Sequence, residues 1–250
     1  MTEPLSERVA LITGAGRGIG RAVALRLAEA GARVALVARS VDQLEETAAT
    51  LRAEGGVALV LSADLAHPDV VAEAAATAAK ELGPVDILVN NAAVVEPAGP
   101  TVSTPPAGWS SAFAVNVQAP IRLTLALLPA MLDRGWGRIV NVSSGIVDHP
   151  GAMVGLNAYA ATKAALEAHT LSLAAEVAGS GVTLNVYRPG SVGMVPRSAT
   201  LRDRRLPAPA FSGLLRTGRA DHPRALRTIP PHPTGRGGHR PDLERDRCLT

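Results

Sequence analysis

Short, almost wholly apolar runs alternate with longer alanine- and leucine-rich segments between residues 9 and 187. The runs read VALIT, RVALVA, VALVL, VDILVN, RIVNVS and VTLNVY. Runs of this kind are typical of parallel strands that are covered by helices on both faces. Because parallel neighbours need helical crossovers between them, the alternation predicts an α/β domain built on a doubly wound parallel sheet of six strands.

The segments between the first four runs carry signals of helix ends. RAVALRLAEA stops at Gly31, VDQLEETAATLRAE stops at Gly55, and VVAEAAATAAKEL stops at Gly83. Glycine adopts the left-handed conformation that often follows the last turn of a helix. These segments are therefore predicted to be the crossover helices.

The alternation stops after Pro196. Residues 1–196 hold 11 Arg and 2 Lys against 17 acids, whereas residues 197–250 hold 12 Arg, no Lys and seven Pro against 5 acids. We expect a single folded domain over 1–196 and an irregular basic tail over 197–250 that adds no seventh strand. The tail has two explanations: out-of-frame translation of a GC-rich gene, or a true extension that contacts nucleic acid or an acidic partner.

Composition excludes several other classes of protein. The single cysteine, Cys248, cannot form an internal disulfide, and no run of 18 uninterrupted apolar residues or signal-peptide pattern is present. A soluble, cytoplasmic protein that contacts no membrane is expected. No metal site is predicted, because none of the six histidines has ligand spacing: His67, His149, His169, His222, His232 and His239.

A glycine-rich turn, TGAGRGIG at residues 13–20, follows the first predicted strand and opens the first helix. Gly14, Gly18 and Gly20 allow a tight turn and a close approach to a pyrophosphate, which the helix N-terminus would bind through its free N–H groups. In this context the turn predicts a Rossmann-type dinucleotide-binding fold. The alternative is an ordinary strand-to-helix turn.

The second predicted strand ends in VALVARS, with Ala38 where an NAD site usually has an acid. Arg39 follows, and Arg17 lies in the glycine turn. Paired arginines suit a 2′-phosphate, so NADP(H) is predicted in preference to NAD(H). Both arginines would otherwise be solvated surface charges.

The stretch YAATK at 159–163 places one of only two tyrosines four residues before one of only two lysines. Residues four apart lie on one face of a helix, so Tyr159 and Lys163 can point into the same cleft. A free phenol is protonated at neutral pH, and a nearby ammonium lowers its pKa. The pair is therefore predicted to be an acid/base device; an isolated pair of this spacing would more simply be a half-buried tyrosine and a solvated lysine.

Over about residues 5–192 the chain resembles the short-chain dehydrogenase/reductase family, and in particular its 3-oxoacyl-[acyl-carrier-protein] reductase-like members. Seven motifs occur in order at the predicted strand and helix ends: TGAGRGIG, Asp64-Leu65, NNAA at 90–93, Asn116, Ser143-Ser144, YAATK and Pro189-Gly190. The resemblance implies an NADP(H)-dependent enzyme that interconverts a small-molecule carbonyl and a secondary alcohol, and a homo-oligomer.

The resemblance also implies roles for individual residues. Tyr159 would donate a proton to the substrate oxygen, Ser144 rather than Ser143 would hydrogen-bond that oxygen, and Lys163 would hold the nicotinamide ribose. Asn116 would position a water that reaches Lys163, or would be only a local backbone partner. The cofactor would contact Gly14, Arg17, Gly18, Ile19, Gly20, Arg39, Asp64, Leu65, Asn91, Ala92, Tyr159, Lys163, Pro189, Gly190 and Val192.

The chain departs from the family pattern at several places. Ala93 replaces a usual glycine, Gly193-Met194 stand where a threonine is usual, and no substrate lid or seventh strand can be recognised after them. A second function class therefore stays open: a cofactor-binding protein of the same fold without turnover, whose basic tail acts in binding.

Overall fold

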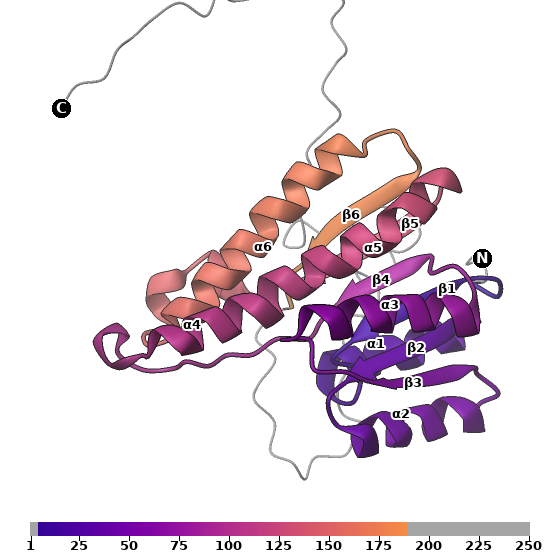
Figure 1. The fold of residues 1–250 in the computed structure, drawn as a ribbon, viewed down its shortest axis with the longest axis horizontal. Helices are drawn as coiled ribbons and strands as arrows, with labels where there is room; N and C mark the ends of the chain where they lie inside the picture. The colour runs from indigo at the N-terminus through magenta and orange to yellow at the C-terminus, as the bar shows by residue number, and fades with distance from the viewer. Residues whose placement is uncertain (1–4, 190–250) are drawn as a thin grey trace, which may run out of the picture.

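The computed structural model describes residues 5–189 of the 250-residue chain. Six strands form one parallel sheet in the order β3-β2-β1-β4-β5-β6 (Figure 1). The strands are β1 (Val9–Thr13), β2 (Arg33–Ala38), β3 (Ala58–Ser62), β4 (Ile87–Asn90), β5 (Gly137–Val142) and β6 (Val182–Tyr187). The predicted six-stranded, doubly wound α/β fold is confirmed, and the predicted tail at 197–250 lies outside the described residues.

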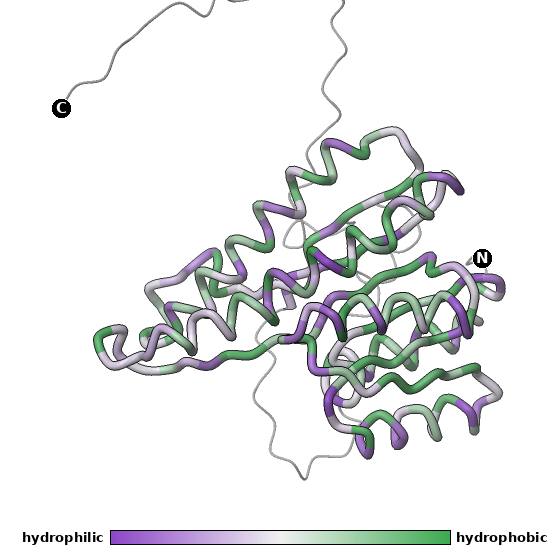
Figure 2. Tube along the Cα trace, in the orientation of Figure 1, coloured by the Kyte–Doolittle hydropathy of each residue, from purple (hydrophilic) through white to green (hydrophobic). Residues whose placement is uncertain are grey.

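Helices cover both faces of this sheet. They are α1 (Gly18–Glu29), α2 (Val41–Ala53), α3 (Pro68–Leu82), α4 (Pro106–Phe113), α5 (Ala119–Asp133) and α6 (Asn157–Glu176). One core cluster joins α3, α5 and α6 to the sheet, and the other joins α1 and α2 to its opposite face. Figure 2 shows the strands as largely hydrophobic, which explains why neither face can be left to solvent.

A π-helical turn, Ala114–Gln118, joins α4 to α5. The continuous stretch Pro106–Asp133 is long and apolar enough to cross a membrane by length and composition, but half of it is buried inside the molecule. Leu123, Leu127 and Met131 belong to the core cluster under α3 and α5. The stretch therefore packs as a core helix of the domain.

The strand order reverses direction between β1 and β4, since the chain moves outward from β1 to β3 and then crosses back. In open parallel sheets, ligands bind at this point, beyond the carboxyl ends of the strands. The glycine turn after β1 and the NNAA segment after β4 meet at this position, and the segment after β5 lies beside them.

Candidate active site

The glycine turn has the shape that close approach of a ligand requires. Gly14 and Gly18 have φ of 66° and 56°, a region that favours glycine. No side chain caps α1, and its first turn carries no acid. The free N–H groups and positive end of the helix therefore face no competing negative charge, which fits a bound pyrophosphate.

Asn91 ties this turn to the end of β4. Its side-chain nitrogen donates to the carbonyl oxygens of Thr13 and Gly14, at 2.9 and 3.2 Å. The Thr13 hydroxyl accepts from the backbone N–H groups of Asn91 and Ala92, both at 3.0 Å. Asn91 and Ala92 thus lie against the glycine turn. Thr13 was not among the predicted site residues. A polar hydroxyl group at the end of an otherwise apolar strand is the sequence feature that could have identified it.

Gly20 is the most crowded position of the turn. A Cβ there would lie within 3.0 Å of the Gly14 carbonyl and of the Asn91 side chain. Gly20→Ala is expected to destabilise the fold by about 1–3 kcal/mol and to weaken dinucleotide binding at least tenfold, by roughly 1.4 kcal/mol or more. Thermal melting and cofactor titration measure both effects.

Gly151 provides the control for that substitution, because a Cβ there would meet nothing within 4 Å. Gly151→Ala should leave both measurements unchanged. Wild-type cofactor affinity in Gly20→Ala would contradict the assigned function of the turn.

The predicted cofactor-specificity residues lie in the glycine turn and directly after β2. Arg17 and Arg39 are both exposed, and among the described residues neither guanidinium is held by an ion pair. Asp64 follows β3, and its carboxylate accepts from the backbone N–H of Ala66 at 3.1 Å, while the adjacent Leu65 is buried. Ile19 and Pro189 are partly buried, whereas Gly190 and Val192 lie outside the described residues.

The structure brings Ser144, Tyr159 and Lys163 together at the start of α6. The Ser144 side chain interacts with the Tyr159 hydroxyl and counteracts the rise of its pKa, and the Lys163 Nζ lies 5.6 Å from the centre of the Tyr159 ring. Lys163 is 2% exposed, and its ammonium donates to the Val142 carbonyl at 2.7 Å. A lysine this deeply buried is rare in a protein core unless its charge is used.

The pKa of Tyr159 and the pKa of Lys163 both differ from the values of the free side chains, and the pKa of Tyr159 differs in the direction opposite to the prediction. Burial is the largest influence on Tyr159 and raises its pKa above 10.0, while the Ser144 hydrogen bond opposes that rise. Burial lowers the pKa of Lys163 to about 8, and the charge of Glu167 opposes that fall. The expected lowering of the Tyr159 pKa by Lys163 is not seen, because the ammonium bonds to the Val142 carbonyl and desolvation of the phenol dominates.

Asn116 lies in the π-helical turn and is fully buried. Its side chain accepts from the Val94 N–H and donates to the Val94 carbonyl, both at 2.8 Å, and donates to the Thr162 hydroxyl at 3.0 Å. That hydroxyl donates to the Tyr159 carbonyl at 2.8 Å. Asn116 is therefore linked to α6 through Thr162, a residue of the YAATK stretch that sequence reasoning did not single out.

Of the paired serines, the structure places only Ser144 beside the Tyr159 phenol. Ser143 is 2% exposed and donates its hydroxyl hydrogen to Glu167 instead. Within residues 5–189 no group of three histidine, cysteine or acidic side chains is arranged to hold a metal ion.

This arrangement defines a class of protein: a dinucleotide-binding parallel sheet with a tyrosine, a serine and a buried lysine at the carboxyl ends of its strands. The chain also matches the family model described as short chain dehydrogenase over residues 8–205. It therefore belongs to the short chain dehydrogenase family, as the seven motifs predicted.

Individual relatives agree with that assignment. A short chain dehydrogenase of Pseudocercospora fijiensis is 41% identical over 190 residues, which are 75% of this chain and 60% of the relative. A metagenomic short-chain oxidoreductase solved with NADP is 40% identical with a TM-score of 0.71, over 75% of this chain and 84% of that one.

The expected likeness to 3-oxoacyl reductases is also found. A 3-oxoacyl (acyl-carrier-protein) reductase of Agrobacterium tumefaciens C58, solved with NADP bound, is 36% identical with a TM-score of 0.70. The match covers 75% of this chain and 71% of that one.

Proposed function

We propose that the protein is an NADP(H)-dependent oxidoreductase that interconverts a carbonyl and a secondary alcohol by hydride transfer. One observation carries the proposal: the buried Lys163 ammonium lies 5.6 Å from the Tyr159 ring, and Ser144 is the side-chain partner of the Tyr159 hydroxyl, in a parallel sheet of dinucleotide-binding type. This set supplies a proton donor and a second hydroxyl for one substrate oxygen, which is what reduction of a carbonyl requires.

The cofactor would supply the hydride, and this chain's residues would do the rest. Gly14, Gly18 and Gly20 would hold the pyrophosphate against the start of α1. Tyr159 would donate its hydroxyl proton to the substrate oxygen as charge develops there, while Ser144 would hydrogen-bond the same oxygen. Lys163, whose ammonium already makes a bond to the Val142 carbonyl, would bind the nicotinamide ribose and stabilise the phenolate that forms.

The raised pKa of Tyr159 fits a proton donor. Burial raises its pKa, so the phenol remains protonated at neutral pH and can act directly as an acid. Oxidation of an alcohol would instead need the phenolate, which this environment disfavours.

Asn116 supports the site through its connections to other residues. Both N–H bonds of its side-chain amide are used by Val94 and Thr162, and its carbonyl oxygen accepts from Val94. The proposed water relay to Lys163 would therefore use the remaining lone pair of the Asn116 side-chain oxygen. Alternatively, the water would bind backbone groups of the π-helical turn, because such turns interrupt the regular hydrogen bonding of a helix.

The preference for NADP(H) is supported by Ala38, Arg39 and Arg17, and by the NADP present in two solved relatives. Arg39→Asp is expected to weaken NADPH binding roughly 10–100-fold and to leave NADH binding nearly unchanged, because a charge-assisted hydrogen bond to phosphate becomes a repulsion. Titration with both cofactors measures this.

Arg122→Asp is the matched control, because it makes the same charge change at an exposed position of α5. It should leave both affinities unchanged. Tighter binding of NADH than of NADPH by the unmodified protein would reject the proposed preference.

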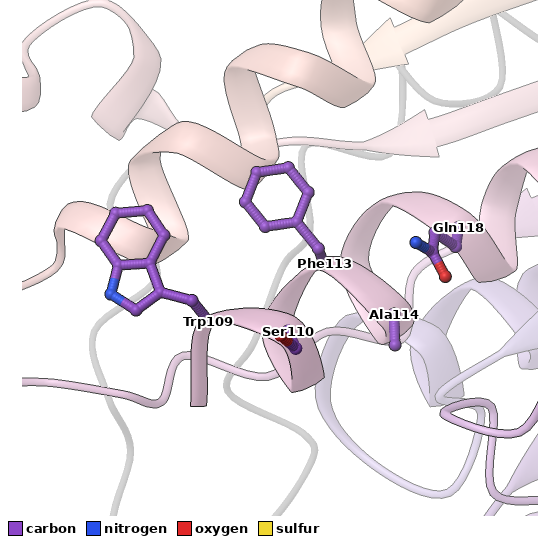
Figure 3. Close-up of a pocket in the computed structure, with 5 residues that line it drawn as sticks. All are labelled: Trp109, Ser110, Phe113, Ala114 and Gln118. Atoms are coloured by element: carbon purple, nitrogen blue, oxygen red, sulfur yellow. The ribbon is translucent and has the colours of Figure 1, made fainter. Parts of the chain in front are cut away.

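A homo-oligomer in the cytoplasm is part of the proposal. Trp109 and Phe113 project from the same side of α4 and line a surface hollow with Ser110, Ala114 and Gln118 (Figure 3). The hollow contains none of the candidate catalytic residues, and aromatic side chains of this kind are enriched at protein interfaces.

Turnover decides between the enzyme and the alternative of a cofactor-binding protein. Oxidation of NADPH is measured with a panel of aliphatic, aromatic and 3-oxoacyl thioester ketones. Consumption that depends on both ketone and protein supports the enzyme. Tight NADPH binding without turnover of any ketone supports the alternative.

A further inference from the structure

A buried carboxylate outside the predicted site connects three of its segments. Glu167 lies on α6 one turn after Lys163 and is 6% exposed. Its carboxylate accepts a hydrogen bond from the Ser143 hydroxyl and two from the guanidinium of Arg188, of which the bond from Nε to Oε1 is 2.7 Å long. A buried acid is costly unless its oxygens are paired in this way.

Each partner of Glu167 stands next to a residue of the candidate site. Ser143 directly precedes Ser144 at the end of β5, and Arg188 directly precedes Pro189 at the end of β6. The two-bond contact from Arg188 is geometrically specific, because both the guanidinium and the carboxylate are planar. The Glu167 carboxylate thus restrains the two strand ends against the helix that carries Tyr159 and Lys163.

We propose that Glu167 is a positioning residue of the active site: it fixes the ends of β5 and β6 on α6 and supplies the negative charge that keeps the Lys163 ammonium charged. The catalytic meaning of this inference rests on the proposed function. Its electrostatic part concerns the folded protein alone and is measurable without substrate or turnover.

The charges around Lys163 are few. Tyr159 and Glu167 belong to its own helix, Arg188 extends from the end of β6, and Asp148 follows β5 and contacts Arg188. The α4 helix and the π-helical turn, which also pack against α6, contain no charged residue. The β5 strand also packs against α6 and carries Arg138. Among the described residues, Glu167 is the acid that acts on the Lys163 charge.

The pKa shifts of Lys163 and Arg188 agree with this arrangement of charges around Glu167. Burial lowers the pKa of Lys163 to about 8, and Glu167 is the opposing influence. The hydrogen bonds to Glu167 are the largest cause that raises the pKa of Arg188 above its usual range. Without Glu167, the Lys163 ammonium would lose the charge that opposes the effect of its burial.

The experiment uses the fact that the chain contains only two lysines, Lys80 and Lys163. Lysine labelled with ¹³C at Cε gives two NMR signals, and Lys80, whose side chain is 82% exposed, serves as the internal reference. The pKa of Lys163 is measured in the wild-type protein, Glu167→Gln and Arg188→Gln. Glutamine keeps the shape of the Glu167 side chain, removes its charge and replaces one accepting oxygen with a donating NH2 group.

We expect the pKa of Lys163 to shift in opposite directions in the two variants. Glu167→Gln should lower the pKa of Lys163 by about one unit, because the compensating charge is lost. Arg188→Gln should raise it by about one unit, because the Glu167 carboxylate is freed from its ion pair with Arg188 and its charge acts more fully on the ammonium. If Glu167 and Arg188 served only to hold the fold together, either substitution would admit water around Lys163. The pKa of Lys163 would then rise in both variants. Shifts of the same sign, or no shift in either variant, would overturn the proposal.

Asp148→Asn provides the control, because Asp148 contacts only the outer side of Arg188 and its side chain is 53% exposed. It should move the Lys163 pKa by less than about 0.5 unit. The pH dependence of carbonyl reduction is a second measurement, in which the alkaline limb of kcat/KM should move to lower pH in Glu167→Gln. A wild-type protein without turnover would reject the proposed function and leave the NMR result standing.

Discussion

Replacing Tyr159 with phenylalanine is expected to lower carbonyl reduction by roughly 10²–10⁴-fold, the usual contribution of a positioned general acid. The substitution removes only the hydroxyl group that bonds to Ser144, and the ring over the Lys163 ammonium remains. NADPH affinity should therefore change little. Steady-state kinetics and cofactor titration separate the two quantities, as expected for loss of a group that acts in the transition state.

Ser144→Ala provides a graded comparison for that result. It removes the second hydroxyl and leaves the proton donor in place, so a smaller loss of kcat, of roughly 10–100-fold, is expected. If the phenylalanine variant kept wild-type kcat, Tyr159 would not be the acid.

Replacing Lys163 with methionine is expected to abolish most activity and to stabilise the fold. Burial lowers the pKa of Lys163 from 10.5 to about 8, so the folded protein binds fewer protons than the unfolded chain between these values. Below pH 8 the full cost of the buried charge is present, about 3 kcal/mol, and it disappears as the pH rises towards 10.5.

Methionine removes that cost and loses the hydrogen bond to the Val142 carbonyl, which contributes about 1 kcal/mol. A net gain of about 1–2 kcal/mol at pH 7 should raise the melting temperature by roughly 2–8 °C. The gain should shrink as the pH rises from 8 to 10.5. A lower melting temperature than that of the wild-type protein at pH 7 would contradict this account.

Lys80→Met is the matched control, since the side chain of Lys80 is 82% exposed and its ion pair with Glu81 is at the surface. The free energy of unfolding should change by less than about 0.5 kcal/mol, and the activity should be unchanged. The contrast between the two lysines would show that the buried charge is kept for function, at the expense of stability.

Strand positions were predictable from local pattern because most strands of this sheet are buried along their length, whereas β3, at one edge, is only partly buried. VALIT, RVALVA and VTLNVY correspond residue for residue to β1, β2 and β6. VDILVN begins two residues before β4, although the backbone of Asp86 still bonds to Val9 and to Arg138 of the two neighbouring strands. The pattern thus finds this strand and differs from its first residue by two positions.

The amino-acid sequence by itself determined the parallel sheet, the glycine turn and the placement of Tyr159 and Lys163 on one helix face, because these depend on residues close together in the chain. Only the tertiary structure decided which Tyr159 neighbours are in contact and how they titrate. Glu167 meets Ser143 and Arg188 across 24 and 21 residues, and Thr13 meets Ala92 across 79. No local periodicity encodes such pairs. The pKa of Tyr159 likewise depends on burial, which arises only when separate segments pack together.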